Sequence, residues 1–258
     1  MKKILSLLLI TFGLLGCQCS DQQDIPEALH TTQNNAKGEN TLSEAEVHDG
    51  WQRLFDGKTL NDWHGYGQSS PAARGRWRVQ QGELQLHPDE GDAALDLLTD
   101  DEYAHFHLRI EWKITEKGNS GIHFHVKEAA QYAAAWQTGP EMQLLDNGSP
   151  GNPGHPDAQV ATHRAGALYD LVAAYAESAR PPGEWNQTDI IVLEEEVTFL
   201  LNGITIVQTA MGEEDWQDLL EASKFVQYPD FGSFASGSIA LQDHGDGVSF
   251  RNIKIKRL

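Results

Sequence analysis

The feature that most limits how this chain can fold is a strict alternation of polar and apolar side chains over residues 105–114. Successive residues of a β-strand point to opposite faces, so this pattern predicts a strand with one face in a core and one toward water. Trp112 lies on the apolar face, and we expect it in the core. Further short runs, separated by Gly, Asn, Asp and Pro, predict strands over residues 189–193, 197–201, 204–208, 238–242 and 248–256.

Two of these runs are joined by Asn202-Gly203, the pair that favours a tight type I′ hairpin. One segment, residues 213–222, is typical of a helix. Many short strands without the strand–helix rhythm of parallel sheets predict an all-β fold, a two-sheet jelly-roll sandwich. We expect a single domain over residues 49–258.

The N-terminal residues indicate export from the cytoplasm. Two lysines precede an apolar run over residues 4–15 that is too short to span a bilayer, and Leu-Leu-Gly-Cys17 follows. This end resembles the bacterial lipobox, so we expect a signal peptide over residues 1–16 and a lipid on Cys17; an ordinary secretory signal is the alternative. The polar residues 17–48 predict a flexible tether. The expected location is the bacterial cell envelope, on the periplasmic or outer-membrane side, with the lipid as the only membrane contact.

The chain is acidic, with 19 Lys and Arg against 38 Asp and Glu and a formal net charge of −19 at pH 7. Cleavage after residue 16 removes two lysines, so the charge becomes −21. Such a chain repels phosphate backbones, and nucleic acid is not an expected partner. Cys17 and Cys19 are the two cysteines, so a lipidated Cys17 leaves no pair for a disulfide in the fold and no thiolate zinc site.

Residues 119–146 carry polar side chains at alternate positions of two short apolar runs. His123 and His125 stand two apart in the first run, and Glu141 and Gln143 stand two apart in the second. Residues two apart on a strand share a face, so neighbouring strands would bring imidazoles, a carboxylate and an amide onto one surface. A partly desolvated glutamate can act as a base, and polar side chains of this kind can bind sugar hydroxyls.

A second polar block ends the expected strand 238–242. Gln242, Asp243 and His244 precede a Gly-Asp-Gly turn, which would place them at the rim of a sheet. A plain hairpin turn is the alternative interpretation. Trp136 lies in an alanine-rich loop, where its ring is free to stack on a sugar ring.

In combination these motifs resemble the domain-of-unknown-function 1080 family, now named the 3-keto-disaccharide hydrolases. The resemblance covers nearly all of residues 51–258. The motifs that carry it occur in order and include Leu-Phe-Asp-Gly-Lys-Thr-Leu-Asn-Asp-Trp at 54–63, Asn-Ser-Gly-Ile at 119–122, Glu-Met-Gln-Leu-Leu-Asp at 141–146, Gly-Ala-Leu-Tyr-Asp-Leu at 166–171, Ser-Lys-Phe at 223–225 and Ile-Ala-Leu-Gln-Asp-His-Gly at 239–245. Many members read Phe-x-Arg after Asn-Ser-Gly, where this chain has His125, and a frequent Tyr is replaced by Met142. Only position 125 matches a polar site of the family, which favours His125 over His123.

The resemblance implies a concanavalin A-like jelly roll with its ligand on the concave face, and activity on glycosides or disaccharides oxidised at C3. A ketone at C3 acidifies the hydrogen on C2, so a base can remove it and the enolate can expel the glycosidic oxygen from C1. We expect Glu141 to be the base. Either His125, Lys224 or a bound divalent metal ion would stabilise the enolate, and His244 would protonate the leaving group or position water. The expected substrate contacts are Gln143, Asp146, Tyr169, Gln242, Asp243 and Trp136.

Two other functions stay open from the sequence. Retaining glucanases of glycoside hydrolase family 16 share the fold and carry Glu-x-Asp-x-x-Glu or Glu-x-Asp-x-Glu, which sets two carboxylates about 5 Å apart. Here Gln143 stands where that pattern needs a carboxylate, which counts against a glucanase. A non-catalytic carbohydrate-binding lipoprotein would use the same aromatic rings and amides.

Overall fold

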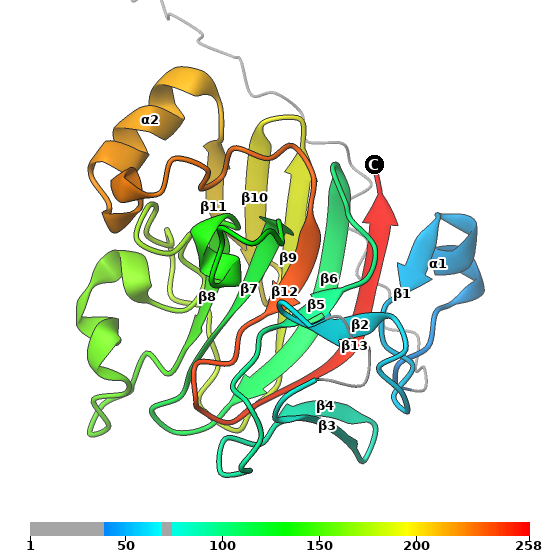
Figure 1. Ribbon diagram of the computed structural model, residues 1–258. Helices are drawn as coiled ribbons and strands as arrows, with labels where there is room; N and C mark the ends of the chain where they lie inside the picture. The colour runs from blue at the N-terminus through cyan, green and yellow to red at the C-terminus, as the bar shows by residue number, and fades with distance from the viewer. Residues whose placement is uncertain (1–38, 69–73) are drawn as a thin grey trace, which may run out of the picture. The chain divides into compact units, whose positions relative to one another are not determined.

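The computed structural model describes residues 39–68 and 74–258, which form two antiparallel β-sheets around a shared core (Figure 1). The larger sheet has the strand order β11-β10-β9-β6-β13-β4-β3, and β1 also pairs with β13. Its strands are β1 (Trp51–Arg53), β3 (Trp77–Gln80), β4 (Glu83–Leu86), β6 (Phe106–Ile114), β9 (Asn186–Leu193), β10 (Glu196–Leu201), β11 (Ile204–Ala210) and β13 (Val248–Arg257).

The smaller sheet has the order β2-β5-β12-β7-β8. Its strands are β2 (Trp63–Gly65), β5 (Leu97–Thr99), β7 (Asn119–Val126), β8 (Glu141–Leu145) and β12 (Ser238–Leu241). The all-β two-sheet jelly roll expected from the sequence is confirmed, and strands lie at all the segments where alternation predicted them.

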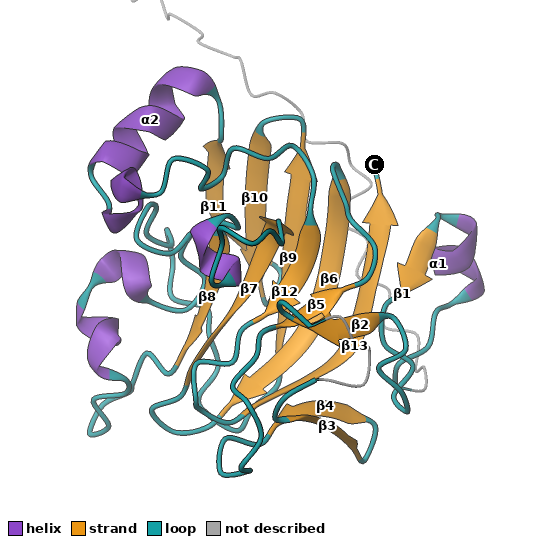
Figure 2. Cartoon of the chain, in the orientation of Figure 1, coloured by secondary structure: helices purple, strands orange, loops and turns teal. Residues whose placement is uncertain are grey.

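Helices are short and lie outside the sheets (Figure 2). They are α1 (Glu44–His48), α2 (Glu213–Glu221) and the single-turn 3₁₀ helices η2 (Ala135–Gln137), η3 (Pro156–Gln159), η4 (Ala161–His163) and η5 (Lys224–Gln227). The helix predicted over residues 213–222 is confirmed as α2.

The core between the sheets is rich in aromatic side chains. Phe106 and Trp112 on β6, Phe124 on β7 and Phe250 on β13 are all fully buried. The Trp112 indole N–H donates to the Thr188 hydroxyl at 2.9 Å, so the ring is buried without an unsatisfied donor. The expected core position of Trp112 is therefore confirmed.

The turn between β10 and β11 shows why the local sequence matters. Asn202 and Gly203 have φ angles of 53° and 81°, and they bring Leu201 opposite Ile204. Positive φ at both turn residues is the type I′ geometry that asparagine and glycine tolerate best. The hairpin predicted from this pair is confirmed.

The end of the expected tether differs from the prediction, because residues 39–48 fold against β13. Asn40 is 5% exposed and its backbone N–H donates to the Asn252 side-chain oxygen at 2.6 Å. Ser43 and Glu46 form a capping box at the start of α1, and Glu46 also pairs with Lys254. A polar composition predicted a tether here, but these polar groups are hydrogen-bonding partners of the domain.

The other predictions for the N-terminal region lie outside the described residues. These are the signal peptide at 1–16, the lipid on Cys17 and the tether up to residue 38. Within the part of the chain that the structure describes, no helix is long and apolar enough to cross a membrane.

Candidate active site

The candidate site lies on the outer face of the smaller sheet, where β7 pairs with β8. Glu141 is opposite His123 in this pairing, and Gln143 is opposite Gly121. The alternate residues of the two strands, among them Ile122 and Met142, belong to the core between the sheets. The period-two pattern therefore places His123, Glu141 and Gln143 on one surface, as the sequence predicted.

His125 does not share this surface, which corrects the sequence-based expectation. The pairing of β7 with β12 shifts register between Ser238 and Ala240, and His125 has a φ of 54°. Such a bulge inserts one extra residue and reverses the alternation beyond it. The His125 ring is 4% exposed, its Nε2 lies 2.9 Å from the Ala104 carbonyl oxygen, and it does not line the cavity at Glu141.

Glu141 is the buried carboxylate of the site. It is 5% exposed, and its Oε1 atom has no hydrogen-bond partner among the described residues. Burial raises the pKa of Glu141 to about 8; the charge of Asp96 also raises this pKa, while Lys224 lowers it. A carboxylate with a pKa near neutrality is suited to accept and release protons.

Glycine at position 121 makes room for the Glu141 side chain. A Cβ atom at this position would lie 1.9 Å from Glu141 Oε1 and 2.6 Å from Cδ. Because no heavier side chain fits there, the Asn-Ser-Gly sequence of β7 allows the carboxylate of the next strand to lie across it.

His123, which the sequence reasoning ranked below His125, lies beside Glu141. It is fully buried, and its Nδ1–H donates to the Gly139 carbonyl oxygen at 3.1 Å, which leaves Nε2 as an acceptor. Nε2 lies 3.4 Å from the Gln242 side-chain nitrogen and 3.9 Å from Glu141 Oε2. Burial lowers the pKa of His123 to about 4, so the ring is neutral at pH 7. His123 and Glu141 both stand at the alternate polar positions of their runs, and this pattern was the sequence signal for His123.

A cation reaches the site from a distant part of the chain. Lys224, at the start of η5, has its Nζ 3.3 Å from the Tyr169 hydroxyl and 4.3 Å from the centre of the Tyr169 ring. The Lys224 backbone N–H donates to the Asp170 carboxylate at 2.9 Å, and the Tyr169 backbone N–H donates to the Glu141 carbonyl oxygen at 2.9 Å. These bonds tie the segments 166–171 and 223–225 to β8.

The side chains enclose a cavity of about 210 Å³. Seven residues expected from the sequence line it together: Glu141, Gln143, Tyr169, Lys224, Gln242, His244 and Trp136. The sequence reasoning missed Asn119, Phe225, Gln227 and Tyr228. Asn119 supports the site directly, because its side-chain oxygen accepts from Gln143 Nε2 at 2.9 Å. Glu141 is the only carboxylate among the described residues that line this cavity.

Two aspartates that were expected to bind substrate, Asp146 and Asp243, do not line the cavity at Glu141. The Asp146 carboxylate is 2% exposed and accepts the backbone N–H groups of Lys117 and Gly148 at 2.8 and 2.9 Å, so it holds two loops together. Asp243 forms a two-pronged ion pair with Arg76, at 2.5 and 3.0 Å. In sequence, a carboxylate used for loop structure looks the same as one that binds a ligand.

The residues at Glu141 do not form a metal site of the usual kind. Within residues 39–68 and 74–258, no group of three or more His, Cys, Asp and Glu side chains is placed to hold a metal ion. The pKa of Glu141 responds to the charges of Lys224 and Asp96, and the neutral His123 has its Nε2 3.9 Å from Glu141 Oε2.

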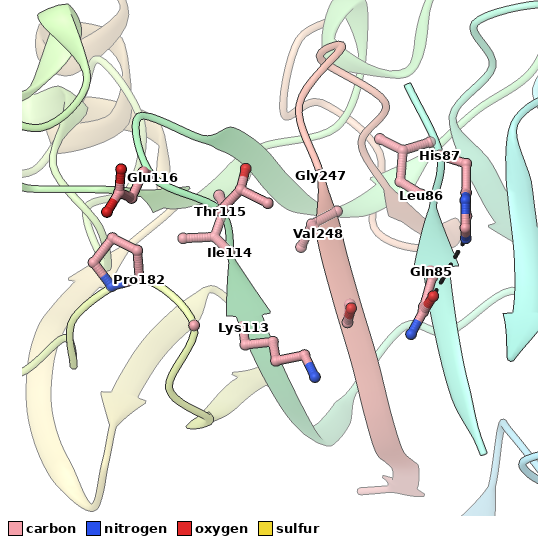
Figure 3. A pocket seen from close by; sticks show the side chains of 12 residues that line it. Gln85, Leu86, His87, Lys113, Ile114, Thr115, Glu116, Pro182, Gly247 and Val248 are labelled. Atoms are coloured by element: carbon pink, nitrogen blue, oxygen red, sulfur yellow. Dashed lines mark hydrogen bonds between the residues drawn. The ribbon is translucent and has the colours of Figure 1, made fainter. Parts of the chain in front are cut away.

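A separate cavity of about 370 Å³ lies at the ends of β4 and β6 and the start of β13 (Figure 3). None of the residues expected at the site lines it. Its cation, Lys113, is paired with Glu83 at 2.9 Å, and its His87 contacts Gln85 at 3.3 Å. Among the described residues that line it, none is a buried acid or base without a partner, which is the feature that distinguishes the cavity at Glu141.

Comparisons with known proteins show which family the domain resembles. A family model described as the 3-keto-alpha-glucoside-1,2-lyase-like domain matches residues 50–256. A protein of Bacteroides thetaiotaomicron named 3-keto-disaccharide hydrolase is 33% identical over 236 residues, which cover 81% of this chain and 79% of that protein.

The fold is also similar to that of solved structures. A candidate glycosyl hydrolase from Parabacteroides distasonis matches with a TM-score of 0.76 at 31% identity, covering 86% of this chain and 100% of that chain. A second candidate glycosyl hydrolase from the same organism matches with a TM-score of 0.56 at 28% identity, covering 80% and 82%.

Proposed function

Because the chain belongs to the family of 3-keto-alpha-glucoside-1,2-lyase-like domains, we propose that it cleaves the glycosidic bond of 3-keto-glycosides or 3-keto-disaccharides, with Glu141 as the base. The named relative and the glycosyl hydrolase-like structures make it a carbohydrate-cleaving enzyme of the glycoside hydrolase type. The oxidised substrate and the order of steps are the part that we propose.

The observation that carries the proposal is the state of Glu141. Its carboxyl group is buried, it has one oxygen without a partner among the described residues, and it faces a cavity that holds no second carboxylate. Ordinary retaining and inverting glycosidases need two carboxyl groups on either side of the bond. A single carboxylate with a pKa of about 8 suits removal of the proton on C2 next to a ketone.

The other side chains at the cavity fit the remaining needs of this reaction. Proton removal from C2 develops negative charge on the C3 oxygen, and Lys224 Nζ is the cation at the cavity wall that can stabilise it. The charge of Lys224 also lowers the pKa of Glu141, so the ammonium group and the carboxylate influence the same part of the cavity. The enolate then expels the oxygen from C1, the C1–O bond breaks, and the leaving oxygen takes a proton.

Gln143, Gln242 and Trp136 are suited to hold the sugar. Gln143 is fixed by Asn119, and Gln242 by contact of its nitrogen with His123. The Gln242 side-chain oxygen has no partner among the described residues and is available to a sugar hydroxyl. The Trp136 ring is partly exposed and packs edge-on against Tyr228, with 4.9 Å between ring centres.

The test compares oxidised and unoxidised glucosides with the purified enzyme. We expect turnover of methyl and 4-nitrophenyl 3-keto-glucosides and none of the matching glucosides. Glu141→Gln should lose about 10²–10⁴-fold in kcat, the range for a general base, and Glu116→Gln, an exposed glutamate in the separate cavity, should not. An added chelator should leave the rate unchanged. Unchanged turnover by Glu141→Gln would exclude Glu141 as the base.

The same experiment separates the two alternative functions. A family-16-like glucanase would cleave unoxidised β-glucans, and a carbohydrate-binding protein would bind sugars without forming product. Glu141 is the single carboxylate among the described residues that line the cavity, which disfavours the glucanase, and its buried Oε1 without a hydrogen-bond partner disfavours a site made only for binding.

We further propose that the enzyme works in the bacterial cell envelope, held by a lipid on Cys17. The support is the basic and apolar start of the chain followed by Leu-Leu-Gly-Cys. Expression of the full chain and of Cys17→Ala in a bacterium, followed by membrane fractionation, tests this. Equal membrane association of the two proteins would contradict it.

A further inference from the structure

A buried amide oxygen at the cavity lacks a hydrogen-bond donor. The Oε1 atom of Gln242 is buried and has no partner among the described residues, and the Gln242 side chain lines the cavity at Glu141. Leaving a buried acceptor without a donor is unfavourable. This oxygen therefore indicates that a ligand in the cavity supplies the donor.

The tautomer of His123 is set by the backbone next to it. Nδ1 of the ring lies 3.1 Å from the Gly139 carbonyl oxygen, which can only accept, so Nδ1 carries the hydrogen. Burial lowers the pKa of His123 to about 4, so the ring holds no second proton at neutral pH. Nε2 of His123 is therefore a bare acceptor.

This bare Nε2 atom fixes the orientation of the Gln242 amide. The Gln242 side-chain nitrogen lies 3.4 Å from His123 Nε2, and because Nε2 can only accept, the amide N–H is the donor. The reverse orientation would bring two acceptors, Nε2 and the amide oxygen, against each other. His123 therefore holds the amide nitrogen toward itself, and Oε1 of Gln242 is the atom left for a ligand.

The backbone of Gln242 is held at the same point of β7 as Glu141. The Gln242 N–H donates to the Gly121 carbonyl oxygen at 3.0 Å, and the Gln242 carbonyl oxygen accepts from the Ser120 hydroxyl at 2.9 Å. Glu141 lies across the same glycine, since a Cβ at Gly121 would be 1.9 Å from Glu141 Oε1. One sugar ring can therefore contact both Glu141 and Gln242.

Resting on the proposed function, we propose that His123 is a positioning residue that sets the specificity of the site, because it holds the Gln242 amide so that Oε1 accepts a hydrogen bond from one hydroxyl of the oxidised sugar. A ketone oxygen accepts hydrogen bonds and donates none, so the C3 oxygen cannot bind Gln242 Oε1. The ketone is bound instead by a donor, Lys224 Nζ, which lines the same cavity. A ring turned so that its ketone meets Gln242 is rejected, which selects one orientation of the substrate.

The first experiment replaces the hydroxyls of the substrate one at a time. The substrates are methyl 3-keto-glucoside and its three analogues with fluorine at C2, C4 or C6. Fluorine is close to a hydroxyl in size and donates no hydrogen bond, so one of the three analogues should lose about 10–10²-fold in kcat/KM through this contact. Fluorine also changes the reactivity of the ring, so each loss is divided by the loss in Gln242→Leu, which has no acceptor at this place.

The matched control is Gln208→Leu, since Gln208 is an exposed glutamine on β11. It should show the same fluorine losses as the wild type. Equal losses in the wild type and in Gln242→Leu for all three analogues overturn the proposal, because Gln242 would then accept from no hydroxyl.

The second experiment tests His123 with the same four substrates. His123→Leu removes the acceptor, so the amide is free to turn and the fluorine loss should fall to the value in Gln242→Leu. His123→Gln supplies an amide oxygen as a new acceptor and should recover part of the loss; circular dichroism establishes that both variants fold. A merely structural role of His123 would lower kcat/KM by one factor for all four substrates, and such unchanged ratios contradict the proposal.

A third measurement needs neither turnover nor a folded variant of His123. Long-range ¹H–¹⁵N NMR spectra of the wild type, labelled in histidine, report which ring nitrogen carries the hydrogen. We expect one fully buried neutral ring, that of His123, with hydrogen on Nδ1 and a bare Nε2 at pH 7. Hydrogen on Nε2 of this ring rules out the proposed orientation of Gln242.

Failure of the proposed function is thereby distinguishable from failure of this inference. If the wild-type enzyme turns over no 3-keto-glycoside, calorimetric titration compares the same four compounds as ligands. Weaker binding of one fluorinated analogue by the wild type, but not by Gln242→Leu, supports the hydroxyl contact. Equal affinities in the two proteins, or no binding by the wild type, overturn it.

Discussion

Replacing Gly121 with alanine tests how Glu141 is held. Gly121 has no positive φ, so alanine is compatible with its backbone, and the three atoms nearest to a new Cβ all belong to Glu141, at 1.9, 2.6 and 2.8 Å. The Glu141 side chain must therefore move away from its place above β7. We expect two effects, a loss of stability from overpacking and a loss of activity from the displaced carboxylate.

The size of each effect follows from the contact. Overpacking a buried site costs about 1–3 kcal/mol, and a displacement of about 1 Å at a catalytic group lowers the rate about 10²-fold. In a Glu141→Ala background the three contacts disappear, so the same glycine-to-alanine change should cost nothing, or should stabilise by about 0.5–1 kcal/mol because glycine disfavours strands. The double-mutant coupling energy is then about 1–4 kcal/mol.

Urea unfolding followed by circular dichroism measures these values for the wild type, the two single variants and the double variant. Gly91→Ala is the control, since Gly91 has neither a positive φ nor an atom within 4 Å of a new Cβ. Equal destabilisation by Gly121→Ala with and without the Glu141 side chain would refute the reasoning, because the glycine would then be needed for a reason other than this carboxylate.

Three further predictions follow from the pKa values and caps. The pKa of Glu141 rises from 4.5 to about 8 on folding, so the folded state holds the proton more tightly, and wild-type stability relative to Glu141→Gln should fall as pH rises from about 4.5 to about 8. The slope of this fall in unfolding free energy is at most about 1.4 kcal/mol per pH unit. Urea unfolding of both proteins at a series of pH values measures it. Lys224→Met removes a charge that lowers the pKa of Glu141, so the pH midpoint for the rise of kcat/KM should move upward. Ser43→Ala removes the cap shared with Glu46 and should cost about 1 kcal/mol in unfolding free energy; no change would show that α1 is not coupled to the domain.

The sequence predicted most of the fold because its signals were local. Alternation over residues 105–114 and the Asn202-Gly203 turn depend on neighbouring residues alone, and both are confirmed. The same reasoning grouped His123 with His125 and failed there, because a bulge inserts one residue and a period-two pattern does not reveal it. The ordered segment 39–48 was mistaken for a tether because composition does not show that Asn40 has a partner at Asn252.

The candidate site was predictable where the family motifs and the alternation of polar side chains indicated the same residues. Glu141, Gln143 and Lys224 line one cavity although Lys224 is far away in sequence. Asp146 and Asp243 do not line this cavity, because tertiary contacts pair Asp146 with the backbone N–H groups of Lys117 and Gly148, and Asp243 with Arg76.

The fastening of the N-terminal segment has a mechanical consequence. Asn40 and Asn252 exchange two hydrogen bonds, at 2.6 and 2.9 Å, and Glu46 and Asp49 pair with Lys254 and Lys256 on the same strand. A pull on the N-terminal end of the domain is therefore borne first by these contacts to β13, in the interior of the larger sheet. Together with β1, these contacts transfer tension along the chain to the larger sheet. The larger sheet therefore bears the force before it reaches β7 and β8, where Glu141 lies.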